Sequence, residues 1–152
     1  MKALSTLELD KILKSNSGTK STFLGTFPSC VYPDTTRTRY SFISNTDNHN
    51  APGVHWIGWF VNNSTVTFFD SFARSPFSDS FPEQYVDFMN KFKSVIFSNL
   101  PVQARGTVSC GYFCIHFIYM LSLGLNIDDF LDEYYDCNDT DIVSFNFVKS
   151  IM

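Results

Sequence analysis

Residues 109–121 read SCGYFCIHFIYML and form the longest nearly apolar run of the chain, without an acid, a lysine or an arginine. A run that is apolar on every side predicts a buried helix, because it leaves no polar face for water. The run is too short to span a bilayer and is interrupted by His116, so we expect no membrane segment. The other elements are expected to pack around this central helix.

Cys110 lies where a loop-like segment, residues 101–109, enters the first turn of the predicted helix. The unpaired N–H groups at a helix start carry partial positive charge. Such surroundings lower the pKa of a thiol and favour the thiolate, which is the nucleophilic form. Gly111 has no side chain that would block a substrate from the sulfur. Cys110 is therefore the candidate nucleophile.

Length and composition predict one globular domain, residues 1–152, because 44% of the residues are hydrophobic and 17% aromatic. The formal net charge of −4 argues against a large nucleic-acid footprint, which needs clustered lysine and arginine. The four cysteines form no paired framework, and the N-terminus does not resemble a signal peptide. We expect a reducing intracellular compartment with free thiols.

Hydrophobic patterning predicts an α+β fold with a small, mostly antiparallel sheet packed on helices. The expected strands are residues 39–44, 54–61 and 65–70, with a short extended piece at 22–27 and another at 102–103. Besides the central helix, the expected helices are residues 5–14, residues 83–97 and a short one within 128–141. The pattern of residues 143–151 does not assign their type.

The two strands 54–61 and 65–70 are joined by a short polar turn, which predicts an antiparallel hairpin. Such a hairpin brings His55, near its start, beside Asp70, at its end. A cysteine nucleophile needs a nearby base and a group that orients the base. The oxyanion formed by attack on an acyl carbon needs donors, which the backbone N–H of Cys110 and the side-chain amide of Gln103 can supply.

Five blocks of the chain jointly resemble the adenovirus protease (adenain) family, which is related to the SUMO-deconjugating, Ulp-type cysteine proteases. The blocks are FLGTF at 23–27, GVHW at 53–56, FDSF at 69–72, Gln103, and SCGYFC at 109–114. The resemblance runs from about Leu4 to beyond Leu121. It implies a papain-like or adenain-like core with the nucleophile at the N-terminus of a buried central helix.

The resemblance also implies roles for single residues. Cys110 would be the nucleophile, His55 the general base and Asp70 the group that orients His55, while Gln103 would complete the oxyanion hole. Trp56, beside the base, would line the substrate cleft. Together with Gly111 and Gly53, Trp56 makes up the expected substrate-binding set.

The implied function is a viral-type cysteine endopeptidase that cuts after glycine, in Gly-Gly or Gly-X sequences, and matures virion precursor proteins. It would act as a monomer on protein substrates, without a metal or cofactor, in an infected host cell, in the nucleus or cytoplasm, and in the virion. Two alternatives are a deconjugase of ubiquitin-like or SUMO-like proteins and an inactive protease-like binding module.

Two departures from the adenovirus enzymes concern activation. Those enzymes use DNA and a viral peptide that is disulfide-linked to a cysteine shortly before the glutamine. Residues 83–102 contain no cysteine, so an activating peptide would have to bind without such a disulfide. The acidic balance also disfavours DNA as a cofactor. We expect activity without either, or with a different activator.

The remaining polar and sulfur-containing residues have simpler interpretations. Cys114 and His116 are expected to be buried helix residues. A zinc site that joins them to Cys110 and Cys137 is disfavoured, because the chain has no Cys-x-x-Cys knuckle. The acidic segment 128–141 is expected to be a solvated face, although it could instead dock a basic partner.

Overall fold

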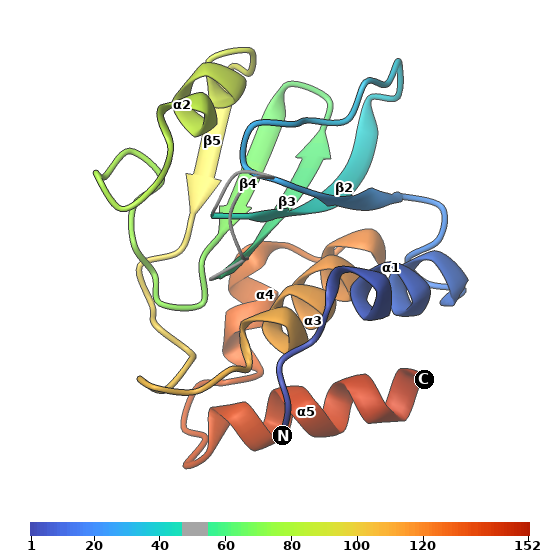
Figure 1. The fold of residues 1–152 in the computed structure, drawn as a ribbon, viewed down its shortest axis with the longest axis vertical. Coiled ribbons are helices and arrows are strands. Elements are labelled where there is room, and N and C mark those ends of the chain that lie inside the picture. The colour runs from blue at the N-terminus through green and yellow to red at the C-terminus, as the bar shows by residue number, and fades with distance from the viewer. Residues whose placement is uncertain (47–54) are drawn as a thin grey trace.

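A five-stranded sheet separates two apolar layers in the computed structural model, which describes residues 1–46 and 55–152. Strands lie in chain order across the sheet: β1 (Phe23–Phe27), β2 (Arg39–Asn45), β3 (Trp56–Asn62), β4 (Thr65–Phe69) and β5 (Ser94–Phe97). One face carries α1 (Thr6–Ser15), α3 (Cys110–Ser122), α4 (Ile127–Asp132) and α5 (Thr140–Ile151), and the other carries α2 (Glu83–Met89) (Figure 1).

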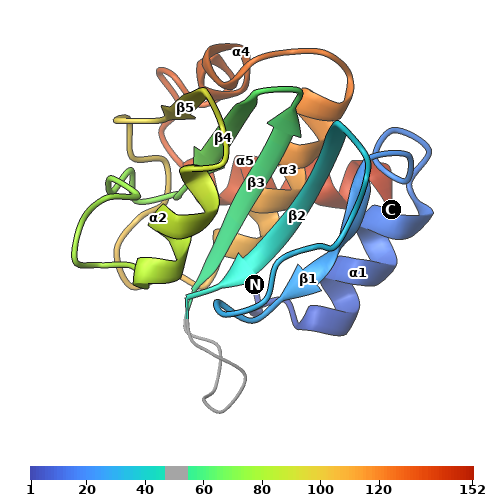
Figure 2. The same cartoon turned by 90° about the horizontal axis from the view of Figure 1, so that it is seen from above.

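The predicted α+β class is confirmed, but the sheet is mixed instead of mostly antiparallel. Strands β2, β3 and β4 pair antiparallel, whereas β1 pairs parallel to β2 and β5 pairs parallel to β4. Figure 2 shows the five strands side by side with α3 behind them. Each outer strand runs parallel to its neighbour, because a long connection carries the chain back to the end of the sheet at which the first of the two strands started. Residues 28–38 make one connection, and the segment with α2 makes the other.

Helix α3 is the buried centre of the helical layer, as its sequence predicted. Every residue of α3 except Tyr119 and Ser122 is buried. The helix packs on β3 and β2, and α5 covers its far side (Figure 1). At Gly58 of β3 the contact is so close that a Cβ atom would lie 2.8 Å from Cδ2 of Phe117. The close approach sets the middle of α3 against β3, the strand that directly follows His55.

Aromatic side chains fill the opposite layer, between the sheet and α2. Trp59 is fully buried and stacks on Phe42 at a centroid distance of 5.6 Å. Tyr85 and Phe88 of α2 meet Trp59 edge to face at 5.0 and 5.4 Å. Aromatic pairs of this kind add to the free energy gained from burial. This packing holds β3 and β4 in a rigid frame.

Several element boundaries differ from the sequence prediction. The helix predicted for residues 83–97 ends at Met89, and Ser94–Phe97 forms the edge strand β5. Residues 102–103 are not in a strand, and residues 143–151 belong to α5. Within the described part of the chain, no helix has both the length and the apolarity that a bilayer crossing needs.

Candidate active site

The β3–β4 hairpin brings an imidazole and a carboxylate together. Its two-residue turn is Asn63-Ser64, and Asn63 adopts a φ of 55°, a conformation that asparagine tolerates and that hairpin turns require. The register pairs Gly58 with Phe69, so the residues beyond the two strand ends also approach each other. His55 Nε2 lies 2.6 Å from Asp70 Oδ1. The juxtaposition predicted from the hairpin is therefore present.

Asp70 is held as a carboxylate by several donors. Its Oδ2 accepts from Nε of Arg74 at 2.8 Å and from the backbone N–H of Arg74 at 3.1 Å. Burial raises the pKa of Asp70, but the hydrogen bonds from His55 and Arg74 outweigh it and lower the pKa to about 2. An ionised carboxylate only accepts, so Nε2 of His55 donates to Asp70.

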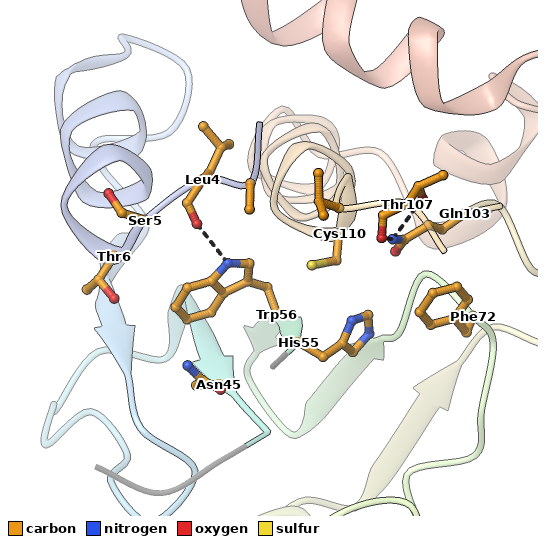
Figure 3. Close-up of a pocket in the computed structure, with 12 residues that line it drawn as sticks. Leu4, Ser5, Thr6, Asn45, His55, Trp56, Phe72, Gln103, Thr107 and Cys110 are labelled. Atoms are coloured by element: carbon orange, nitrogen blue, oxygen red, sulfur yellow. Dashed lines mark hydrogen bonds between the residues drawn. The ribbon is translucent and has the colours of Figure 1, made fainter. Parts of the chain in front are cut away.

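In this tautomer Nδ1 of His55 carries no proton and can accept one from the thiol of Cys110. The sulfur faces the imidazole ring across the pocket (Figure 3). Burial lowers the pKa of His55, but the contacts with Asp70 and Cys110 outweigh it, so the pKa is raised above its ordinary value. Phe72 stacks on the ring at a centroid distance of 5.2 Å and limits its rotation. The imidazole is thus oriented and disposed to take a proton.

Cys110 is the first residue of α3 and borders a pocket of about 400 Å³ together with His55, Trp56 and Gln103. Only 8% of Cys110 is exposed, so a substrate reaches the sulfur through this pocket. Cys114, one turn later, has no exposed surface, and its Sγ lies 3.5 Å from the carbonyl of Trp56. Burial raises the pKa of Cys114 well above its ordinary value. Of these two helix thiols, only Cys110 can meet a substrate.

The side-chain amide of Gln103 is oriented from both ends. Ser71 is fully buried, and its hydroxyl donates to Oε1 of Gln103 at 2.5 Å. The amide Nε2 donates to the carbonyl and to Oγ1 of Thr107, at 3.0 and 3.1 Å. Ser71 therefore fixes which end of the amide is the donor, and Figure 3 shows the bonds from that end to Thr107. Both Gln103 and Thr107 border the pocket that Cys110 also borders, and an oxyanion there would take over one of the two amide bonds that now go to Thr107.

The three residues expected to bind substrate have different surroundings. Trp56 borders the pocket and donates from Nε1 to the carbonyl of Leu4 at 3.1 Å. Gly111 is buried, and a Cβ there would lie 3.3 Å from atoms of Leu4, Leu9 and Trp56. The missing side chain of Gly111 therefore makes room for packing and does not open a path to the sulfur, contrary to the sequence argument. Gly53 lies outside the described residues.

Sequence reasoning missed Arg74, Ser71, Thr107 and the N-terminal wall of the pocket. Residues 3–6 line the pocket opposite His55, because Leu4 is buried against α3. The position of Arg74 four residues after Asp70 was an available signal, since a cation that close can pair with the acid. No comparable signal pointed to residues 3–6, which meet the pocket only through the tertiary fold. In residues 1–46 and 55–152 no three His, Cys, Asp or Glu side chains gather as metal ligands.

No protein-family model matches the chain, and no curated protein matches it. Solved structures do. The ASFV pS273R protease superposes with a TM-score of 0.57 at 19% sequence identity, over 76% of this chain and 43% of that one. The chain therefore spans less than half the length of the ASFV enzyme. The SUMO protease Ulp1, with its catalytic cysteine oxidized to a sulfinic acid, superposes with a TM-score of 0.57 at 16% identity, over 99% of this chain and 77% of that one.

These likenesses define the class of fold. The chain has the fold that the ASFV pS273R protease and the SUMO protease Ulp1 share, which agrees with the fold that its motifs predicted. At such low identity the two structures share a fold with this chain, and activity has to follow from the residues of the site itself.

Proposed function

We propose that this chain is a cysteine protease whose nucleophile is Cys110. The observation that carries the proposal is the arrangement of His55, which is bonded at Nε2 to ionised Asp70 and contacts the Cys110 thiol within one pocket. Nucleophile, base and orienting acid in this order are what activation of a thiol requires. The shared fold of two cysteine proteases supports the same conclusion.

The proposed reaction proceeds through a thioester. His55 Nδ1 takes the thiol proton, and the sulfur attacks the substrate carbonyl carbon. The resulting oxyanion accepts from the backbone N–H of Cys110 and the amide of Gln103. As the C–N bond breaks, His55 gives its proton to the leaving amine. Water, deprotonated by His55, then releases the acyl group as an acid and restores the thiol, while Asp70 stabilises the imidazolium at each stage.

The proposed substrates are proteins cut after glycine. The sulfur lies in a pocket that the aromatic rings of Trp56 and Phe72 border, and a glycine at the scissile bond passes such rings with less hindrance than a branched residue. Maturation of virion precursor proteins in an infected cell and in the virion is the biological role that we propose. Likeness to a viral protease supports this choice.

Deconjugation of a ubiquitin-like protein is the second candidate. It is favoured by the superposition on the SUMO protease Ulp1, which covers 99% of this chain. Both candidates use the same chemistry at Cys110, so the shape of the preferred substrate separates them. A deconjugase would cleave a folded ubiquitin-like fusion much faster than a short Gly-Gly peptide, and a maturation protease would not.

Cleavage of both substrate types by the purified chain tests the proposal. We expect Cys110→Ala to abolish cleavage, whereas Cys114→Ala, the matched control in the same helix, retains the turnover number and mainly lowers stability. Cleavage that survives in Cys110→Ala would contradict the mechanism.

The same assay with and without DNA tests the expectation about activation. We expect equal rates, because the net charge of −4 disfavours binding to a polyanion. Strict dependence on DNA would overturn this expectation and leave the assignment of Cys110 intact.

A further inference from the structure

The start of helix α5 holds the loop that precedes the nucleophile. Thr140 donates from its hydroxyl to the carbonyl of Val102, and the backbone N–H of Ala104 donates to Oδ2 of Asp141 at 3.4 Å. Both contacts join residues more than 30 positions apart in the chain. The acidic segment 128–141 thus contacts the site at the start of α5. Asp141 is therefore not simply a charge in solvent.

The other oxygen of the Asp141 carboxylate contacts two hydroxyls of the same loop. Oδ1 accepts from Oγ of Ser109 and lies 3.2 Å from Oγ1 of Thr107, whose single proton can also go to the carbonyl of Ala104, 2.8 Å from Oγ1. Oγ1 of Thr107 in turn accepts from Nε2 of Gln103 at 3.1 Å. Hydrogen bonds to an ionised acceptor are stronger than neutral ones. The Asp141 carboxylate therefore holds Thr107 together with Ala104, whose backbone N–H also donates to it. Thr107 in turn holds the donor end of the Gln103 amide.

Ser109 links the same carboxylate to the helix that carries the sulfur. Ser109 is the N-cap residue of α3, where a serine hydroxyl ordinarily accepts from an N–H of the first turn. Here it makes no such bond and donates to Asp141 instead. Because the hydroxyl is drawn away from the helix, it does not occupy an N–H group of the first turn, where the N–H of Tyr112 donates to the Ser109 carbonyl at 3.0 Å.

We propose that Asp141 is a positioning residue for the oxyanion hole, an inference that rests on the proposed function. It acts through Thr107 on the Gln103 amide and through Ser109 on the backbone at Cys110. It touches neither the substrate nor the reacting atoms. Loss of its charge and of one of its two acceptor oxygens lets the loop 103–109 shift, which displaces both donors together.

Kinetics of Asp141→Asn test the inference, with Asp139→Asn as the matched control. Asp139 caps the same helix by accepting from the N–H of Ile142 at 3.1 Å with one oxygen, a bond that asparagine retains. Asp141 accepts with both oxygens, so asparagine at 141 places an amide NH₂ against a donor, while both variants remove one charge from the same helix start. We expect Asp141→Asn to lower kcat by about 10- to 100-fold, as misplaced groups do, with KM little changed. Asp139→Asn is expected to keep the wild-type kcat. Equal kcat in wild type and Asp141→Asn would overturn the inference.

A double-mutant cycle separates positioning from a general loss of structure. If Asp141 acts through Gln103, the cost of Asp141→Asn shrinks several-fold in a Gln103→Ala background. An undiminished cost in that background would contradict the inference.

Hydrogen exchange gives a readout that needs no substrate. Exchange of residues 104–109, followed by mass spectrometry, should accelerate in Asp141→Asn and not in Asp139→Asn. Unchanged exchange in Asp141→Asn would overturn the positioning role, even if the chain cleaved no substrate. If the wild type cleaves no substrate but the loop exchanges faster in Asp141→Asn, only the proposed function is contradicted.

Discussion

At the scale of single residues, His55 is held between a carboxylate and a thiol, and each partner has its own support. Arg74 pairs with Asp70 at 2.8 Å and lies over the ring of Phe81 at 4.9 Å. Ser71, next to Asp70 in the chain, orients Gln103. The strand end that supplies the acid therefore also aligns the oxyanion donor, so both functions depend on the conformation of residues 70–74.

Replacing Arg74 by glutamine tests whether the guanidinium group lowers the pKa of Asp70. Asp70 keeps its bonds from His55 and backbone N–H groups but loses the cation, so its pKa should rise from about 2 toward 3.8. The pKa of Asp70 is lowered in the folded protein, so the stability that the carboxylate contributes is present above pH 3.8 and is lost as the pH falls through about 2. A higher pKa of Asp70 in the folded variant moves this loss of stability to higher pH. Carbon NMR titration of the Asp70 carboxyl measures the change. An unmoved midpoint, equal to that of an Arg37→Gln control, would contradict the pairing.

Gln103→Ala should lower kcat by about 10²–10³-fold if the amide donates to the oxyanion. Ser71→Ala should give a smaller loss, because the amide remains but its orientation is no longer fixed. Gln84→Ala, an exposed glutamine on α2, is the control with unchanged kcat. A wild-type turnover number in Gln103→Ala would remove the amide from the mechanism.

At the scale of elements, the sequence predicted what local patterns determine. The polar turn between two apolar strands indicated the hairpin that joins His55 to Asp70, and the unbroken apolar run indicated α3. Strand β5 was missed because Phe92 and Ile96 continue the helical spacing of α2, while the parallel pairing of Ser94–Phe97 with β4 is a long-range contact. The bond from α5 to the loop before Cys110 has no local signal either.

Gly58→Ala tests the contact that sets α3 against β3. The new Cβ would lie 2.8 Å from Phe117, which must shift, so we expect a loss of about 1–3 kcal/mol in the free energy of unfolding. Adding Phe117→Leu should return about 1 kcal/mol of that loss, measured by urea denaturation. Strictly additive losses would show that the two residues do not collide.

At the scale of the whole molecule, the sheet separates two cores with different contents. The layer around α2 is aromatic, whereas the layer around α3 also buries an imidazole, that of His116. Its Nδ1 lies 2.5 Å from the hydroxyl of Tyr134, and Phe147 of α5 stacks on the ring at 3.8 Å. Burial lowers the pKa of His116 to about 4, so the folded protein keeps this imidazole neutral.

Stability should therefore fall on acidification between pH 6.5 and 4. The unfolded chain binds a proton at His116 near pH 6.5 but the folded chain only near 4, which corresponds to about 3 kcal/mol. His55 has the opposite sign: its pKa is raised, so its contribution is complete below pH 6.5 and is lost as the pH rises through the folded pKa. Urea unfolding at several pH values should show a shallower acid loss in His116→Gln. Superimposable pH curves would contradict the burial argument.

The most direct test of the central claim measures the reactivity of Cys110 itself, since a thiolate and not a thiol reacts with iodoacetamide. Alkylation at pH 6, followed by peptide mapping, should label Cys110 rapidly, leave buried Cys114 unlabelled, and slow about tenfold or more in His55→Ala. Equal labelling rates of Cys110 in the wild type and in His55→Ala would show that the imidazole does not activate the sulfur, and would leave a protease-like fold that serves as a binding module.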